Sequence, residues 1–260
     1  GLDGGRKKSV DKRHAKGYRT ARENLRQLCD EGSFVEYGQL AVAAQRDRMS
    51  SEKLKAETAA DGVITGLATI NADQFGEHAT QVAVIVNDYT VLAGTQGYFH
   101  HRKIDRMLEQ AKRGYLPVVM YTEGGGGRPG DTDVKIQIAG LDVPTFASWA
   151  SLSGQVPMIA VNNGYCFAGN AALFGCADIR IATKSSWIGM AGPAMIEGGG
   201  LGNFAPTDIG PMDVQSKNGV VDLVADDEAH ATALAQQCLS YFQGGSDNWQ
   251  CADQLELREM

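Results

Sequence analysis

The stretch VPMIAVNNGYCFAGNAALFGCADIRIAT, residues 156–183, decides the fold class. Its pattern predicts an apolar strand, a turn that contains glycine, a short helix and a second strand, at 156–161, 164–170, 170–175 and 179–183. The residues before it follow the same order, with a strand, a run of four glycines and a helix at 116–122, 124–127 and 143–153. This alternation predicts an α/β fold. Both glycine turns then follow strands, at the sheet edge where α/β proteins bind ligands.

Hydrophobic periodicity predicts the remaining elements. Further strands are expected at 62–70, 81–86 and 89–94, with Asn87-Asp88 as a hairpin turn between the last two. Helices are expected at 10–30, 98–113 and 229–243. The first of these is rich in Lys and Arg, so we divide the chain into a basic N-terminal helix, residues 1–32, and a main domain, residues 33–260.

Composition excludes several classes of protein. A net charge of −7 and a pI near 5.2 argue against a nucleic-acid partner. The five cysteines form no CxxC pair, so we expect a reducing, cytoplasmic location, no metal and no zinc ribbon. Residues 143–177 carry no charge, but prolines and glycines interrupt them, so no membrane span is expected. No signal peptide is recognisable, and the first residue, Gly1, suggests a piece of a longer chain.

The glycine turns allow three chemical interpretations. Gly125, Gly127 and Gly130 match GxGxxG, but Pro129 follows at once where a phosphate-binding helix should begin, which disfavours a dinucleotide site. Cys166 lies on a strand-to-helix turn like that of an acyl-transfer nucleophile, but no histidine pattern supplies a base, so a buried, inert cysteine is favoured. Third, the glycines let backbone N–H groups converge on one point and form an oxyanion hole. Taken alone, such a turn is more often only a turn.

A resemblance to a known family decides between these interpretations. Residues 156–183 resemble the core of the crotonase superfamily, whose ClpP-like fold of repeated ββα units forms a spiral and binds acyl-CoA thioesters. Within it, the chain resembles the carboxyltransferase component of biotin-dependent acyl-CoA carboxylases. The likeness runs in the family's order through RHAKGYRTARENLRQLCDEGSFVEYG, GVITGLATI, VVMYTEGGGGRPGD, MAGPAMIEGGG and DIGPMDVQSKNGVVDLVADDE.

The resemblance implies a role for individual residues. The catalytic N–H groups would belong to Gly125, Gly126, Ala168 and Gly169. The substrate-binding residues would be Gly94, Gly97, Gly124, Gly127, Arg128 and Phe167, in which Gly124 and Gly127 let the loop turn tightly and Arg128 ties it down. Residues 94–102 would line the CoA site. The basic helix is either a solvated face, which is favoured, or a contact for the CoA phosphates.

Two departures from related sequences are informative. Superfamily hydratases use a glutamate where this chain has Ala172, and Glu197 lies in surroundings closer to those of carboxyltransferases. The common carboxyltransferase loop, Asp-Ser-Gly-Gly-Ala-Arg, is here Glu-Gly-Gly-Gly-Gly-Arg, residues 123–128. The absent side-chain base agrees with the family's mechanism, in which biotin supplies the carboxyl group and takes the α-proton, while protein dipoles hold the enolate.

The resemblance also implies partners and leaves alternatives. Biotin would arrive on a separate carrier domain, alongside a biotin carboxylase, and a C-terminal carboxyltransferase half would complete the site in a homo-oligomer. The expected substrate is an acyl-CoA (acetyl-CoA, propionyl-CoA or longer). The alternatives are an acyl-CoA decarboxylase subunit of the same fold and a non-catalytic CoA-binding or assembly domain. Gly198, Gly199 and Gly200 receive no role from the sequence.

Overall fold

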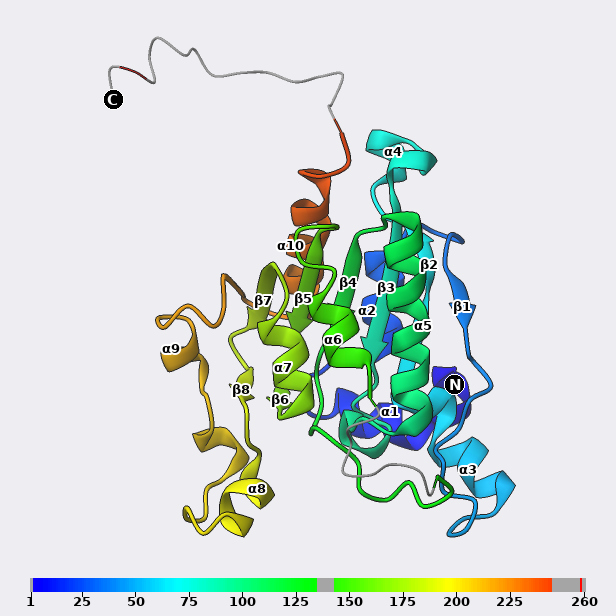
Figure 1. Cartoon of the computed structure of the whole chain (residues 1–260), viewed down its shortest axis with the longest axis vertical. Helices are drawn as coiled ribbons and strands as arrows, with labels where there is room; N and C mark the ends of the chain where they lie inside the picture. The colour runs from blue at the N-terminus through cyan, green and yellow to red at the C-terminus, as the bar shows by residue number, and fades with distance from the viewer. Residues whose placement is uncertain (1, 135–142, 245–257, 259–260) are drawn as a thin grey trace.

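The computed structural model describes residues 2–134, 143–244 and 258. Its strands are β1 (Val35–Tyr37), β2 (Val63–Thr69), β3 (Gln81–Asn87), β4 (Val118–Tyr121), β5 (Met158–Asn162), β6 (Tyr165–Phe167), β7 (Ile179–Thr183), β8 (Trp187–Gly189) and β9 (Leu223–Ala225). Its helices are α1 (Lys7–His14), α2 (Ala21–Leu28), α3 (Ser51–Glu57), α4 (Ala72–Phe75), α5 (Tyr98–Gly114), α6 (Thr145–Ala150), α7 (Gly169–Gly175), α8 (Pro193–Gly198), α9 (Met212–Gln215) and α10 (Glu228–Ser240). The predicted α/β class is confirmed (Figure 1).

Seven of these strands form one mixed sheet in the order β1-β2-β3-β4-β5-β7-β9. The first three strands pair antiparallel, and β3, β4, β5, β7 and β9 pair in parallel. In the parallel part Val86 lies opposite Tyr121, and Tyr121 lies opposite Val161, so the carboxyl ends of β3, β4 and β5 share one edge. Both glycine turns therefore leave the sheet side by side.

Two successive ββα units follow from the sequence stretch that decides the fold. In the first, β5 leads through the short strand β6 into α7; in the second, β7 leads through β8 into α8. The long strands lie in the main sheet, and β6 and β8 pair with each other in a separate two-stranded sheet. The predicted repetition of ββα units is present in this part of the chain.

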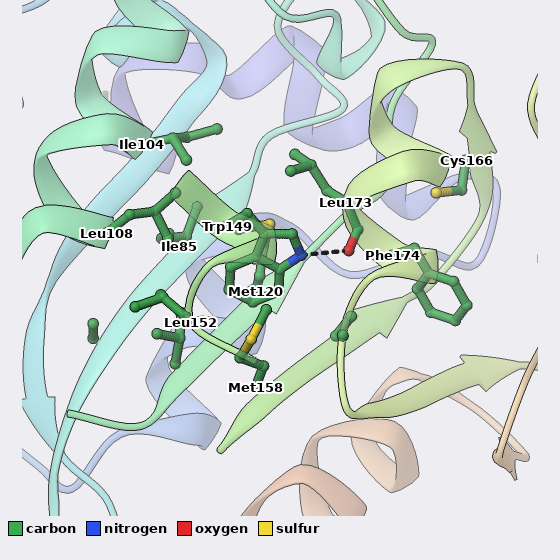
Figure 2. Close-up of a cluster of buried hydrophobic side chains, with 14 of the residues drawn as sticks. Ile85, Ile104, Leu108, Met120, Trp149, Leu152, Met158, Cys166, Leu173 and Phe174 are labelled. Carbon is green, nitrogen blue, oxygen red and sulfur yellow. Dashed lines mark hydrogen bonds between the residues drawn. The ribbon is translucent and has the colours of Figure 1, made fainter. Parts of the chain in front are cut away.

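Helices cover both faces of the sheet, and alternate strand residues bury against each layer. On one face α5, α6 and α7 pack over Ile85, Met120 and Met158 (Figures 1 and 2). Trp149 is buried there, and its Nε1 donates to the carbonyl oxygen of Leu173 at 2.7 Å, which ties α6 to α7. On the other face α2 and α10 pack over the alternate strand residues, among them Val84, Val119 and Ile159.

The single helix predicted over 10–30 is wrong, because the chain forms α1 and α2 with a break between them. Gly17 takes a φ of +78° in this break. Thr20 then starts a new helix: its Oγ1 accepts from Glu23 N at 3.1 Å, while the Glu23 carboxylate accepts from Thr20 N at 2.7 Å. This reciprocal capping box marks a helix N-terminus, so it separates the two helices. The division of the chain at residue 32 stays a prediction.

The strand predicted over 89–94 is also wrong, and so is its hairpin turn. Asp88 Oδ1 accepts from Thr90 N at 3.0 Å, and the Asp88 carbonyl oxygen accepts from Val91 N at 3.0 Å, which turns the chain. Leu92, Ala93 and Gly94 then take φ values of +48°, +54° and +62° in a short 3-10 turn. The antiparallel partner of β3 is β2. The other predicted helices and strands are found with shifted ends.

Candidate active site

The two glycine turns contact each other directly through their backbones. Gly124 N donates to the Tyr165 carbonyl oxygen at 2.7 Å, and Phe167 N donates to the Gly124 carbonyl oxygen at 2.9 Å. This isolated parallel bridge continues the order of the main sheet past the ends of β4 and β5. The segments that sequence analysis placed at one sheet edge are therefore joined.

Two of the glycines are required by the closeness of this contact. Gly126 is buried with a φ of +91°, and a Cβ atom added there would lie 2.7 Å from the Cβ of Ala168. A Cβ on Gly124 would lie 2.3 Å from Asn170 Nδ2. Residues with side chains would strain the first turn or push the turns apart.

The side chain of Asn170 joins the two turns through hydrogen bonds. It is fully buried at the start of α7, where its Oδ1 accepts from Gly126 N at 2.9 Å and its Nδ2 donates to the Thr122 carbonyl oxygen at 3.1 Å. Each of these bonds fixes one end of the segment between β4 and Gly126. The sequence carries no signal for this role of Asn170, because its partners lie more than forty residues away along the chain.

The hydrogen bonds distinguish among the four N–H groups predicted to form the hole. Gly125 N donates to the Ala93 carbonyl oxygen at 3.0 Å, Gly126 N to Asn170 Oδ1, and Ala168 N to the Gly189 carbonyl oxygen at 3.1 Å. Gly169 N has no acceptor among the described residues, and the same holds for Gly127 N. The N–H groups left for a ligand are thus those of Gly127, which is exposed, and Gly169, which is half-buried.

Ala168 carries backbone strain at this point. Its φ of +51° and ψ of −120° lie where residues with a Cβ are rare, and it directly precedes α7. Such strain is a common property of functional sites. Here it turns the chain sharply between β6 and α7 and leaves Gly169 N at the first position of the helix, where no intrahelical acceptor exists.

The segment 94–97 packs along the first turn. Gln96 N donates to the Gly126 carbonyl oxygen at 2.8 Å, and Arg128 N donates to the Gln96 carbonyl oxygen at 2.9 Å, so Gln96 spans Gly127. Gly94 and Gly97, predicted to bind substrate, are buried against the turn: a Cβ on Gly94 would lie 2.5 Å from the Glu123 carbonyl oxygen. The backbone of this segment supports the turn.

Arg128 holds the far end of the first turn. Its guanidinium forms ion pairs with the fully buried Asp61 and with Asp131, whose Oδ1 lies 2.8 Å from Nε. Asp61 Oδ2 also accepts from His100 N at 2.7 Å, at the start of α5. Burial raises the pKa of Asp61 to about 6, and the nearby Arg128 charge opposes that rise. Arg128 thus ties the loop to the body of the domain.

Glu123 holds the near end of the first turn through a second buried ion pair. Arg13 Nη1 and Nη2 lie 2.8 and 2.6 Å from the two oxygens of its carboxylate. Arg13 also lies 3.9 Å from the carboxylate of Glu228, which accepts from Asn24 Nδ2 at 2.6 Å. Burial raises the pKa of Glu228. The chain segment between β4 and residue 129 is clamped at both ends by arginine–carboxylate pairs.

A cavity of about 340 Å³ lies beside this clamp, between α1 and the loops that follow β3, β4 and β5. Its lining combines aromatic rings with basic groups, namely Tyr18, Tyr89, Tyr165, Lys12 and Lys16. Arg13 stacks over the rings of Tyr18 and Tyr89, with its guanidinium carbon 4.8 and 5.6 Å from the ring centroids. The sequence indicates the basic helix but not this cavity, because the residues that line the cavity come from four separate segments.

The remaining candidates occupy structural positions. Cys166 is fully buried, as predicted, and burial raises the pKa of its thiol to about 12, which favours the interpretation of an inert cysteine. Phe167 is buried, with its ring centroid 5.7 Å from that of Tyr165. Ala172 lies in α7, and Glu197 is exposed on α8. No helix lies within residues 128–134, which follow the turn that matches GxGxxG.

The glycines left without a role gain one explanation. Gly200 takes a φ of +69°, its N donates to the Glu197 carbonyl oxygen at 3.0 Å, and Leu201 N donates to the Ile196 carbonyl oxygen at 3.1 Å. This pair of bonds is the Schellman arrangement that ends a helix, so Gly200 terminates α8. Within the described ranges we find no group of three His, Cys, Asp or Glu side chains placed to hold a metal ion, and no helix long and apolar enough to cross a membrane.

Comparisons with known proteins agree with this geometry. The family model of the carboxyl transferase domain matches residues 12–255. The methylmalonyl-CoA carboxyltransferase 12S subunit of Propionibacterium freudenreichii subsp. shermanii is 30% identical over 92% of this chain and 43% of its own length. The methylmalonyl-CoA decarboxylase subunit alpha of Veillonella parvula is 30% identical over 92% of this chain and 45% of its own.

Solved structures extend the comparison to the fold. The structure of a single-chain, multi-domain long-chain acyl-CoA carboxylase is 61% identical, superposes with a TM-score of 0.92, and covers 97% of this chain and 25% of its own. The chain thus spans less than half the length of the curated relatives it matches. With the family model matching nearly its whole length, the chain belongs to the carboxyl transferase domain family, with the crotonase-type fold.

Proposed function

We propose that this chain supplies the acyl-CoA half of a biotin-dependent carboxyltransferase. The reaction adds a carboxyl group to the α-carbon of an acyl-CoA through its enolate. The observation that carries this proposal is the pair of unengaged N–H groups, Gly127 and Gly169, on two turns that are fixed to each other through Asn170. An enolate oxygen carries negative charge that its thioester lacks, so fixed N–H donors stabilise it selectively.

This proposal changes the predicted set of donors. Gly125, Gly126 and Ala168 would have to give up existing hydrogen bonds to serve as donors, whereas Gly127 and Gly169 would not. We therefore assign the hole to Gly127 and Gly169, and assign Gly125, Gly126 and Ala168 to holding the two turns in place. Gly169 is retained from the sequence prediction; Gly127 moves from turn-forming to catalytic.

The CoA moiety has a matching surface nearby. We assign its phosphates to Lys12 and Lys16, because both line the cavity beside the first turn, and its adenine to the aromatic walls formed by Tyr18, Tyr89 and Tyr165. Of the two interpretations of the basic helix, this choice favours the contact with CoA phosphates over a solvated face.

Biotin supplies the carboxyl group and, in our proposal, is carried on a separate domain. The described residues fit this arrangement, because the two free N–H donors bind the thioester oxygen and the reaction needs no side-chain base from this chain. We assign the remaining biotin contacts to a C-terminal half, in agreement with the share of the relatives that this chain spans. Exposed Met190, Met195, Leu201 and Phe204, on the segment after β8, offer that half an apolar contact.

The assembly and location belong to the same proposal. We assign the working enzyme to a homo-oligomer with biotin carboxyl carrier and biotin carboxylase components, in a cytoplasmic setting. The cysteines in the described part of the chain, Cys29, Cys166, Cys176 and Cys238, are unpaired, which supports a reducing compartment.

A decarboxylase subunit is the second candidate, because the decarboxylase relative is as similar to this chain as the carboxyltransferase relative. The test is to assemble the chain with its C-terminal half and supply carboxylated biotin with acetyl-CoA or propionyl-CoA. Formation of the carboxylated acyl-CoA supports carboxyl transfer. Loss of the carboxyl group from malonyl-CoA or methylmalonyl-CoA, without the forward reaction, would favour the decarboxylase, and the absence of any acyl-CoA binding would favour an assembly domain.

A further inference from the structure

The side chain of Gln96 holds a buried donor without a partner. Gln96 is only 3% exposed, and its Nε2 makes no hydrogen bond to any described residue. An amide group buried in this way lowers the stability of the folded protein. Buried polar groups are nearly always satisfied, so this exception requires an explanation.

The amide of Gln96 lies against Gly169, one of the two residues with a free backbone N–H group. Its Oε1 is 2.3 Å from the position that a Cβ atom on Gly169 would occupy, so the amide covers the Cα of that glycine. The backbone of the same residue bonds to both neighbours of Gly127, through Gly126 O and Arg128 N. Gln96 therefore contacts both turns, through its backbone at the two neighbours of Gly127 and through its side chain at Gly169.

An aromatic ring covers the same position from α6. Phe146 Cζ is 3.1 Å from the Cβ position of Gly169, and the residue is 37% exposed. A partly exposed ring at the surface can change rotamer at small cost. The Phe146 ring and the Gln96 side chain thus both lie against Gly169, which is half-buried.

We propose that Gln96 is a third catalytic donor: when the Phe146 ring turns outward and the amide rotates so that Nε2 takes the place of Oε1 beside Gly169, Nε2 hydrogen-bonds the thioester oxygen together with Gly127 N and Gly169 N as the enolate forms. This inference rests on the proposed function, and it adds a side-chain donor to the backbone N–H donors of the two turns. The unsatisfied amide is then a donor kept ready for the reaction, and it lowers stability in the absence of substrate.

The test substitutes methionine, which has nearly the same length and no donor. Gln96→Met removes an unsatisfied polar group, so we expect the melting temperature to rise by at least 2 °C. Because the donor acts on the enolate, we expect kcat to fall at least tenfold while KM for the acyl-CoA changes less than threefold. Stability and activity are thus expected to change in opposite directions.

Gln243 provides a matched control. It is 4% exposed, but its side chain is satisfied: Nε2 donates to the Ile70 carbonyl oxygen and Oε1 accepts from Asn71 Nδ2, both at 2.8 Å. It lies at the opposite edge of the sheet, next to the end of β2. Gln243→Met should lower the melting temperature and leave kcat within twofold of wild type.

A binding measurement separates this proposal from the function on which it rests. An acyl-CoA analogue that carries a nitronate in place of the enolate should bind Gln96→Met at least tenfold more weakly than wild type. A CoA thioether without that oxygen should bind both equally. Wild-type kcat and wild-type nitronate affinity in Gln96→Met would overturn the proposal. A lowered melting temperature with kcat unchanged would overturn it as well, because that result indicates a purely structural side chain. If wild type binds the nitronate at least tenfold more tightly than Gln96→Met but transfers no carboxyl group, the proposed function fails while the contact of Gln96 with the enolate oxygen stands.

Discussion

Arg13 and Glu123 lie 110 residues apart in the chain and form a two-fold ion pair, in which Nη1 and Nη2 approach the two carboxylate oxygens to 2.8 and 2.6 Å. Each side chain is 9% exposed. Glu123 begins the first glycine turn, and a Cβ on Gly164, at the start of the second, would lie 2.4 Å from its Oε1. The pair therefore fixes α1 to both turns at once.

The loss of one partner of this pair should be costly. Glu123→Gln leaves the buried Arg13 charge with only the more distant Glu228 carboxylate, 3.9 Å away, so we expect the free energy of unfolding to fall by about 3 kcal/mol. Glu109→Gln is the control, since it removes an exposed pair with Arg113, and should change stability by less than about 0.5 kcal/mol. Denaturant titration of the two variants measures both effects. Equal, small losses would show that the pair does not hold the turns.

The last two glycines of the first turn, Gly126 and Gly127, should tolerate a methyl group very differently. Gly126→Ala places a Cβ 2.7 Å from that of Ala168 at a φ of +91°, so we expect a loss of about 2–3 kcal/mol of stability. A Cβ on Gly127 meets no atom within 4 Å, and its φ is not in the strained range, so Gly127→Ala should be neutral within about 0.5 kcal/mol. Thermal unfolding of the pair tests this difference. Equal melting temperatures would contradict the packing of the turns described above.

The cavity beside α1 should contribute electrostatically to the binding of CoA. Lys12→Ala and Lys16→Ala should each raise the dissociation constant for an acyl-CoA by about three- to tenfold at low ionic strength, and by less in 1 M salt, where charges are screened. Lys8→Ala is the matched control on the same helix, because Lys8 does not line the cavity. Isothermal titration calorimetry at two salt concentrations distinguishes them. The same affinity in all three variants would show that the basic helix is only a solvated face and does not bind the CoA phosphates.

The protonation of Asp61 should cause kcat to fall on the acidic side of the pH profile. The charged and titratable groups around the Asp61 carboxylate come from two segments. Arg128 and Asp131 belong to the segment after the first glycine turn, and His100, His101 and Lys103 belong to helix α5. Burial raises its pKa to about 6, so below that pH it becomes neutral and its ion pair with Arg128 is lost. We expect kcat to fall as the pH drops through about 6, because the loop that carries Gly127 is then held less firmly.

The same protonation of Asp61 should raise the stability of the folded protein, although it lowers kcat. A folded-state pKa of about 6 lies above the ordinary value of 3.8, so the proton binds more tightly to the folded protein. The contribution of Asp61 to the free energy of unfolding therefore grows as the pH falls from about 6 toward 4 and is lost as the pH rises through 6. Profiles of kcat against pH for wild type and Asp61→Asn provide the test. An acidic limb that persists unchanged in Asp61→Asn would assign it to another group.

The sequence predicted the parts of this site that depend on local pattern. Apolar runs that end in glycine located β4, β5 and both turns, and the periodicity of residues 98–113 located α5. The resemblance predicted Gly169 as a donor, and the structure shows that its N–H group has no acceptor among the described residues. The break between α1 and α2 also had a local signal, since Thr20 and Glu23 have the spacing of a capping box, which marks a second helix start inside the apolar pattern.

The remainder depends on contacts between distant segments. The oxygen atoms of Ala93, Asn170 and Gly189 accept hydrogen bonds from three of the turn N–H groups and so determine which N–H groups stay free. The sequence of the turn does not show that these acceptors lie nearby. The partner of Glu123 could not be identified for the same reason, although a charged residue directly after a buried strand was a usable signal. Gln96 stands out only because its Nε2 is buried and unpaired, which no sequence pattern reports.

The most direct test of the central claim removes one N–H group from the hole. Gly127→Pro lacks the backbone donor, whereas Gly127→Ala retains it at the same position. In the complete enzyme, with folding verified by circular dichroism, we expect kcat for carboxyl transfer to fall by about 10²–10³ in Gly127→Pro and to stay within twofold of wild type in Gly127→Ala. A folded Gly127→Pro enzyme with wild-type kcat would contradict the assignment of this N–H group to the thioester oxygen.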